Sequence, residues 1–223
     1  MKLALFLVPP LVVLVFLLIR AEFALRKKQI YLLKPLCTVL VILMAALSLL
    51  EPTHNPTYTW GVLLGLLFSF GGDVLLMFQD DPRYFRLGLV SFLIAQVVYA
   101  LVFGLLGRFS SRDLLTTALL AAAGLGLFLL MAPNLGQMRI PVLVYIVVIS
   151  LMVSRAVSTA ASPLFTAAQA WLVAAGALLF YVSDGILALN RFWKAWPYHR
   201  ISLAFYYAGQ ALIALAASYF VVA

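Results

Sequence analysis

Long apolar stretches alternate with short polar segments along the whole chain. Eight stretches are long enough for a helix to cross the hydrocarbon core of a membrane, which takes about 20 residues. They cover residues 3–20, 31–50, 58–78, 84–106, 113–132, 139–160, 168–189 and 200–222. The short connections contain several prolines and leave no room for a soluble domain. The pattern therefore predicts an all-α membrane protein, with residues 1–223 forming a single domain of eight transmembrane helices.

The first stretch has a second interpretation, because Met1 and Lys2 followed by an apolar run also resemble a signal peptide. No convincing small-residue cleavage site follows it. We therefore expect this stretch to be the first helix.

Composition agrees with a membrane protein. The chain is 66% hydrophobic and 10% charged, whereas soluble domains have roughly 45–50% apolar and about 25% charged residues. The net charge of +8 comes from residues in short segments between helices. This distribution favours membrane lipids as partners and argues against nucleic acid. Cys37 is the single cysteine, so the chain cannot form an internal disulfide or a thiolate metal site.

The basic residues are divided unevenly between the two sides of the predicted bundle. One set of connections contains Arg20, Arg26, Lys27, Lys28, Lys34, Arg83, Arg86, Arg139, Arg191, Lys194 and Arg200. The other side has Lys2, Arg108 and Arg112, with Arg155 near the outer end of the sixth helix. Because segments rich in Lys and Arg stay in the cytoplasm, we expect both termini to lie outside. In a bacterium the chain would be a multi-pass protein of the inner (plasma) membrane.

One phrase occurs twice without a gap. It reads Trp60-Gly-Val-(x2)-Gly65-x-Leu-(x5)-Asp73 in the third helix and Trp171-Leu-Val-(x2)-Gly176-x-Leu-(x5)-Asp184 in the seventh. An even number of spans between the copies preserves their direction across the membrane. The repetition predicts two parallel four-helix pseudo-repeats.

Asp73 and Asp184, the acids of the repeated phrase, are the main candidates for chemistry. An acid inside the hydrocarbon layer costs at least about 2.5 kcal/mol and usually marks a functional site. Both lie on the order of 10 Å from the cytoplasmic helix ends. Other polar residues at membrane depth are Lys34, Ser69, Gln96, Tyr99, Tyr145, Tyr181, Ser183, Tyr206, Tyr207 and Gln210. A pair of carboxyl groups in such a chamber suits general acid and general base catalysis on a lipid.

Other hydrolytic sites lack the necessary residues. The two histidines, His54 and His199, are not clustered as a zinc site requires. No Gly-x-Ser-x-Gly sequence is present, and Cys37 has no nearby histidine in the sequence. Three alternatives to catalysis stay open: a structural polar clamp between helices, a proton-coupled transporter, and a non-catalytic lipid-binding protein.

Several short phrases point to a known family. They are Lys34-Pro35-Leu36, Gly72-Asp73, Gly88-Leu-Val-Ser-Phe92 continuing to Tyr99, Pro141-Val-Leu-Val-Tyr145, Gly176-Ala-Leu-Leu-Phe180-x-x-Ser183-Asp184 and Tyr207-Ala-Gly-Gln210. In this order they resemble the YhhN-type lysoplasmalogenase family of membrane proteins, over nearly the whole chain.

The resemblance implies a membrane hydrolase that cleaves the vinyl ether bond of lysoplasmalogens, a class of lysophospholipid. The products are a fatty aldehyde and a glycerophospho-alcohol. Asp73 and Asp184 match the acids favoured as catalytic in that family, and we expect the reaction to need neither a metal nor a cofactor. One acid would protonate the alkenyl carbon, and the other would stabilise the resulting cation and activate water, as carboxylate pairs do in glycosidases. Which aspartate has which role stays open.

We expect the substrate to be bound by Lys34, Gln96, Tyr145, Ser183, Tyr207 and Gln210. Lys34 could hold an acid ionised, bind the lipid phosphate or extend to the membrane interface. Headgroup contacts are expected from Arg86, Arg139 and Arg200 at the inner surface. The family often has histidine where this chain has Gln96. If that histidine carries protons, activity here would be altered or lost, whereas a positioning role could be filled by glutamine.

Overall fold

The structure is a computed structural model that describes residues 2–220, and it is a helical bundle without strands in that range. A 3₁₀ turn, η1 (Leu3–Leu7), leads into α1. The α-helices are α1 (Val8–Phe23), α2 (Lys27–Ala46), α3 (Pro56–Leu76), α4 (Pro82–Leu106), α5 (Ser111–Met131), α6 (Arg139–Ser158), α7 (Ala167–Phe192) and α8 (Ser202–Ala216).

Within residues 2–220, eight helices are long and apolar enough to cross a membrane, as the sequence predicts. Their ends differ from the predicted ones by a few residues. The first, for example, continues to Phe23 rather than residue 20, because Arg20 and Glu22 extend the helix and Glu22 pairs with Arg200 of the segment before α8. The predicted end of the last helix, at residue 222, lies outside the described residues.

Two of the helix starts follow from local sequence. Pro56 and Pro82 occupy the first positions of α3 and α4, where the missing N–H of proline is not needed. The residue before each proline caps the helix: Asn55 accepts a hydrogen bond from Tyr58 N, and Asp81 accepts one from Arg83 N. Asp73 lies at the other end of α3, about one turn before the helix ends at Leu76.

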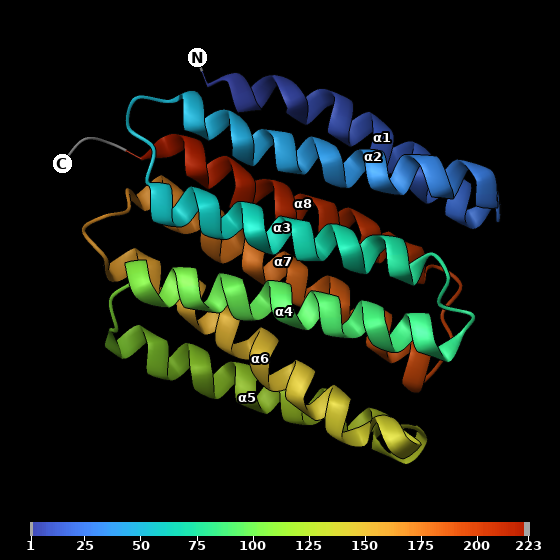
Figure 1. Ribbon diagram of the computed structural model, residues 1–223. Coiled ribbons are helices and arrows are strands. Elements are labelled where there is room, and N and C mark those ends of the chain that lie inside the picture. Colours follow the sequence, from blue (N-terminus) through green and yellow to red (C-terminus); the bar gives the residue numbers. More distant parts are fainter. Residues whose placement is uncertain (1, 221–223) are drawn as a thin grey trace.

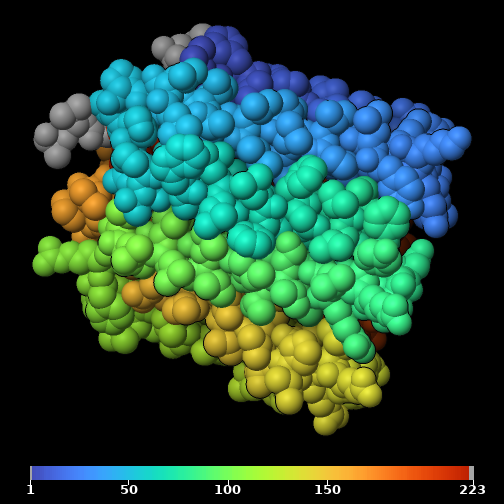
Figure 2. Space-filling view, in the orientation of Figure 1, coloured from blue at the N-terminus to red at the C-terminus, as the bar shows by residue number. Residues whose placement is uncertain are grey.

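The helices run roughly parallel or antiparallel to one another and form layers (Figure 1). In the view of Figure 1, α1 and α2 lie at the top, α5 and α6 at the bottom, and α3, α4, α7 and α8 between them. Figure 2 shows α2, α3 and α4 side by side on one face of the bundle. Large apolar side chains on these helices point outward, among them Leu32, Leu67 and Leu101. Such a surface suits contact with lipid tails.

Close contacts between α7 and α8 depend on two glycines. A Cβ atom added to Gly176 would lie 2.7 Å from Gly209 O, and one added to Gly209 would lie 2.6 Å from Gly176 O. Glycines of this kind let transmembrane helices approach closely. The equivalent glycine of the first phrase, Gly65, packs against the ring of Tyr99 on α4. The same phrase therefore packs α3 on α4 and α7 on α8, which supports the predicted pseudo-repeat; the repeat itself stays a prediction.

We predict that Gly176→Val lowers the free energy of unfolding by about 1–3 kcal/mol, because the new side chain would overlap the α8 backbone. Thermal unfolding in detergent micelles would measure the change. Gly126→Val is the matched control, since no described atom lies within 4 Å of a Cβ built there. Equal melting temperatures for the two variants would contradict the close α7–α8 contact.

Candidate functional site

Both intramembrane acids line one pocket, which lies toward the end of the bundle where α7 ends and α8 begins. The space between its walls is about 1150 Å³, including the part that opens to the outside. Its polar and charged lining residues are Lys34, Asp73, Gln79, Tyr145, Tyr181, Ser183, Asp184, Arg191, Arg200, Ser202 and Tyr206. Most of the remaining lining residues are apolar, so the acids lie at the wall of a largely hydrophobic chamber.

Asp73 on α3 is buried and is held by partners from two other helices. Lys34 Nζ of α2 lies 3.5 Å from Asp73 Oδ1. Thr38 Oγ1, one turn further along α2, donates to Asp73 Oδ2 at 2.7 Å, and Tyr206 of α8 donates to the same oxygen at 2.8 Å. Lys34 is buried as well, so it forms an ion pair inside the bundle instead of extending to the interface.

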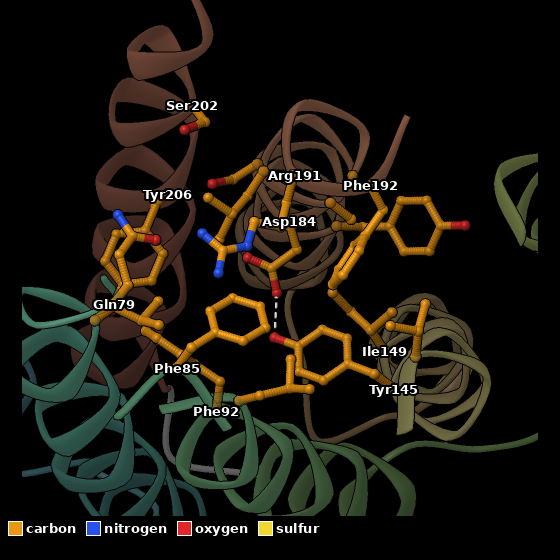
Figure 3. A pocket seen from close by; sticks show the side chains of 18 of the residues that line it. Gln79, Phe85, Phe92, Tyr145, Ile149, Asp184, Arg191, Phe192, Ser202 and Tyr206 are labelled. Atoms are coloured by element: carbon orange, nitrogen blue, oxygen red, sulfur yellow. Dashed lines mark hydrogen bonds between the residues drawn. The ribbon is translucent and has the colours of Figure 1, made fainter. Parts of the chain in front are cut away.

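Asp184 on α7 has a different set of partners. The Tyr145 hydroxyl of α6 donates to Asp184 Oδ2 at 2.5 Å (Figure 3). Gln96 Nε2 of α4 lies 3.0 Å from the same oxygen and 2.7 Å from the Tyr145 hydroxyl. Within the described part of the chain, Asp184 has no ion pair. Its carboxyl group is therefore held by neutral donors only.

The two acids have corresponding surroundings that differ in charge. Each is contacted from the preceding helix of its own half: Lys34 and Thr38 of α2 contact Asp73, and Tyr145 of α6 contacts Asp184. An offset of 111 residues relates Asp73 to Asp184 and also relates Lys34 to Tyr145. At equivalent positions, one acid thus has a cation and the other has a phenol. Asp73 therefore has a compensating charge inside the bundle, whereas Asp184 has none among the described residues.

Three of the predicted substrate-binding residues lie behind the pocket wall. Tyr207 donates to Lys34 O at 3.0 Å, while Gln210 accepts from Tyr99 and donates to Ser69, each at 2.9 Å. Gln96 is fully buried and contacts Asp184 as described. None of the three is among the lining residues. Their positions fit roles in holding the helices and the acids, rather than direct contact with a ligand.

The other predicted residues, Lys34, Tyr145 and Ser183, do line the pocket. Of the arginines expected to bind a headgroup, Arg200 lines it, whereas Arg86 is exposed and Arg139 bonds to Ala132 O at 3.3 Å. Neither Arg86 nor Arg139 contributes to the lining, because both side chains lie on the outside of the bundle.

Three residues near the acids had not been assigned to the site from sequence: Thr38, Tyr206 and Arg191. Helical spacing could have found two of them, since Thr38 follows Lys34 by four residues and Arg191 follows Asp184 by seven. Tyr206 precedes Gln210 by four residues and so shares a helix face with it, but the choice between Tyr206 and Tyr207 depends on how α8 is rotated.

A buried acid and a partly buried acid, each with hydrogen-bond donors and one with a cation, line a largely apolar pocket inside the bundle. Together with the eight-helix bundle of residues 2–220, this site indicates an integral multi-pass membrane protein.

The chain belongs to the YhhN family, whose model matches residues 29–217. It is similar to lysoplasmalogenase TMEM86A of Bos taurus, with 40% identity over 163 residues that cover 70% of this chain and 64% of that protein. The Homo sapiens TMEM86A is 38% identical over 162 residues, with the same coverage of 70% and 64%. Lysoplasmalogenase TMEM86B of Rattus norvegicus is 32% identical over 178 residues, which cover 79% of this chain and 69% of that protein. The chain thus spans 64% of the length of both TMEM86A proteins, and no solved structure matches it.

We predict that Lys34→Met destabilises the fold by about 3 kcal/mol or more, since it leaves the buried charge of Asp73 without its cation. Asp73→Asn in the same chain should restore most of this loss, because it removes the uncompensated charge. Equilibrium unfolding in mixed micelles of the wild type, both single variants and the double variant would measure the coupling. If the double variant lost as much free energy of unfolding as the two single variants together, the result would contradict the ion pair.

Proposed function

We propose that this protein hydrolyses the vinyl ether bond of lysoplasmalogens, releasing a fatty aldehyde and a glycerophospho-alcohol. The observation that carries the proposal is the pair of acids with unlike partners on one pocket, Asp73 beside a lysine and Asp184 beside a tyrosine. The names of the TMEM86A and TMEM86B relatives support this substrate class.

The partners favour different roles for the two acids. We assign Asp73 as the carboxylate, because Lys34, Thr38 and Tyr206 together stabilise a negative charge on it. Asp184 is the general acid. Its Oδ2 atom is held by Tyr145 and Gln96, which leaves Oδ1 as the oxygen to carry the transferable proton. Positioned acids of this kind contribute typically about 10²–10⁴-fold to a rate.

The steps balance with one water consumed. Asp184 transfers a proton to the alkenyl carbon that is not bonded to oxygen, and the double-bond electrons form the new C–H bond. The resulting oxocarbenium ion is stabilised by the carboxylate of Asp73. Water then adds to the cationic carbon and gives its proton back to a carboxylate, which yields a hemiacetal. Transfer of the hemiacetal hydroxyl proton to the ether oxygen breaks the C–O bond and releases aldehyde and alcohol.

We place the pocket in the cytoplasmic half of the membrane with both termini on the outside, because most Lys and Arg residues lie in the connections at the pocket end. The acid and base groups named above supply all proton transfers. The proposed reaction uses no metal ion.

We predict that Asp73→Asn and Asp184→Asn each lower aldehyde release from a lysoplasmalogen by at least about 100-fold. Asparagine keeps the size of the side chain but neither donates an acidic proton nor carries a charge. Aldehyde formed by the purified protein would be quantified by mass spectrometry. Asp80→Asn is the matched control, since that acid is almost fully exposed and pairs only loosely with Lys27 at 3.8 Å.

Wild-type rates in both site variants would refute the proposed chemistry. Lysolipid binding by the wild type without product would instead identify a lipid-binding protein, and movement of intact lipid across a vesicle membrane would identify a transporter. Each outcome is measured with the same purified protein and the same substrate.

A further inference from the structure

The pocket has two chemically different sides. One side has polar residues from α2, α3, the α3–α4 connection, the segment before α8 and α8 itself: Lys34, Asp73, Gln79, Arg200, Ser202 and Tyr206. The opposite side is hydrocarbon from α5, α6 and α7: Leu127, Met131, Val142, Ile146, Ile149 and Ala188. Figure 3 shows Gln79, Ser202 and Tyr206 on one side of Asp184, and Tyr145, Ile149 and Phe192 on the other. Asp184 therefore lies where the polar and apolar sides meet.

Arg191 differs from the other cations of the pocket. Lys34 is paired with Asp73, and Arg200 Nε lies 3.3 Å from the carboxylate of Glu22. Arg191 has no ion pair within residues 2–220; its guanidinium carbon lies 4.6 Å from the centre of the Phe85 ring. An arginine that stacks on an aromatic ring keeps its edge N–H groups available for an anion. Arg191 is thus the lining cation best placed to bind an anionic group.

The spacing along α7 relates this cation to the reacting group. Arg191 follows Asp184 by seven residues, about 10 Å along the helix axis, and both line the pocket. Side chains of a helix lean toward its N-terminus, which brings the guanidinium back toward Asp184. In a lysophospholipid, a glycerol unit joins the phosphate to the sn-1 ether oxygen. This unit can span the remaining distance between the Arg191 guanidinium and the Asp184 carboxyl group.

Gly185 leaves the apolar side open next to the acid. It lines the pocket directly after Asp184, and a Cβ atom added to it would have only Leu127 Cδ1 nearby, at 3.8 Å. That distance is an ordinary van der Waals contact. A side chain at this position would therefore extend into the pocket without striking the backbone of another helix.

We propose that the pocket binds a single-chain phospholipid in one orientation: the phosphate at Arg191, the glycerol beside Asp73 and Asp184, and the hydrocarbon chain along α5 and α6 past Gly185. This orientation deepens the proposed function and rests on it for the identity of the bond that is cut. The orientation itself is a matter of binding, so it can be tested with lipids that cannot be hydrolysed.

The position of the lipid's hydrocarbon chain is tested with saturated 1-O-alkyl lysophospholipids that have long or short alkyl chains. We expect Gly185→Leu to weaken binding of the long-chain lipid by at least about 10-fold, a typical effect of filling space that a few methylenes occupied. Binding of the short-chain lipid should change by less than about 2-fold. Gly126→Leu is the matched control, because it adds the same side chain at an exposed position outside the pocket lining. If Gly185→Leu weakened the binding of both lipids equally, or of neither, the proposed position of the hydrocarbon chain would be overturned.

Ile149→Trp places a larger side chain on the same apolar side of the pocket, from α6. Its effect on lipid binding should depend on the length of the lipid chain in the same way. This variant keeps the proposal testable if Gly185→Leu does not fold. If neither variant showed an effect that depends on chain length, the hydrocarbon chain would not bind along this side of the pocket.

The phosphate position is tested with Arg191→Gln. We expect at least roughly 10-fold weaker binding of the alkyl lysophospholipid, since the variant loses a charge-assisted hydrogen bond to the phosphate. Binding of a 1-O-alkylglycerol, which lacks the phosphate, should be unchanged. Equal loss for both ligands would overturn the assignment of Arg191. If the wild type released no aldehyde while these binding differences held, the proposed hydrolysis would fail and the binding orientation would stand.

Discussion

The constraint on which the site depends is the free-energy cost of a charge in the hydrocarbon layer. Asp73 is 2% exposed, and an ion at such a position is tolerated only when another group compensates it. Lys34, Thr38 and Tyr206 provide this compensation from α2 and α8. Because the partners come from opposite ends of the sequence, their contacts with Asp73 also fix how α2, α3 and α8 pack. The same contacts that make the charge tolerable thus set one wall of the pocket.

One pair of equivalent positions gives the two acids different partners, a lysine for Asp73 and a tyrosine for Asp184. If the halves arose from a common ancestor, Lys34 and Tyr145 occupy the same place relative to Asp73 and Asp184. A lysine in both halves would leave two carboxylates and no proton donor, and a tyrosine in both would leave two acids and no compensated charge. In the proposed mechanism, one of each provides the acid and the base that general acid–base catalysis requires within one pocket.

The sequence alone predicts the helices and the two acids well, because apolar length and buried charge are strong local signals. It predicts side-chain direction poorly. Helices that contact both lipid and protein are apolar on all faces, so their rotation does not appear in the hydrophobic pattern. For this reason Tyr207 and Gln210 were expected in the site and point behind it, while Tyr206 and Arg191 line it. The same limit applies to Lys34, whose ion pair with Asp73 does not appear in the hydrophobic pattern.

The geometry around Gln96 bears on the histidine that the family often has at this position. Gln96 is fully buried and lies behind Asp184, away from the pocket lining. Its amide nitrogen contacts both Asp184 and the Tyr145 hydroxyl, while its oxygen has no partner among the described residues. The contacts of this residue with the site are thus made by a donor, which a histidine N–H would equally provide. A residue in this place contacts the carboxyl group without lining the pocket. We therefore infer that glutamine preserves the positioning role here, and that the proton transferred in the reaction comes from Asp184.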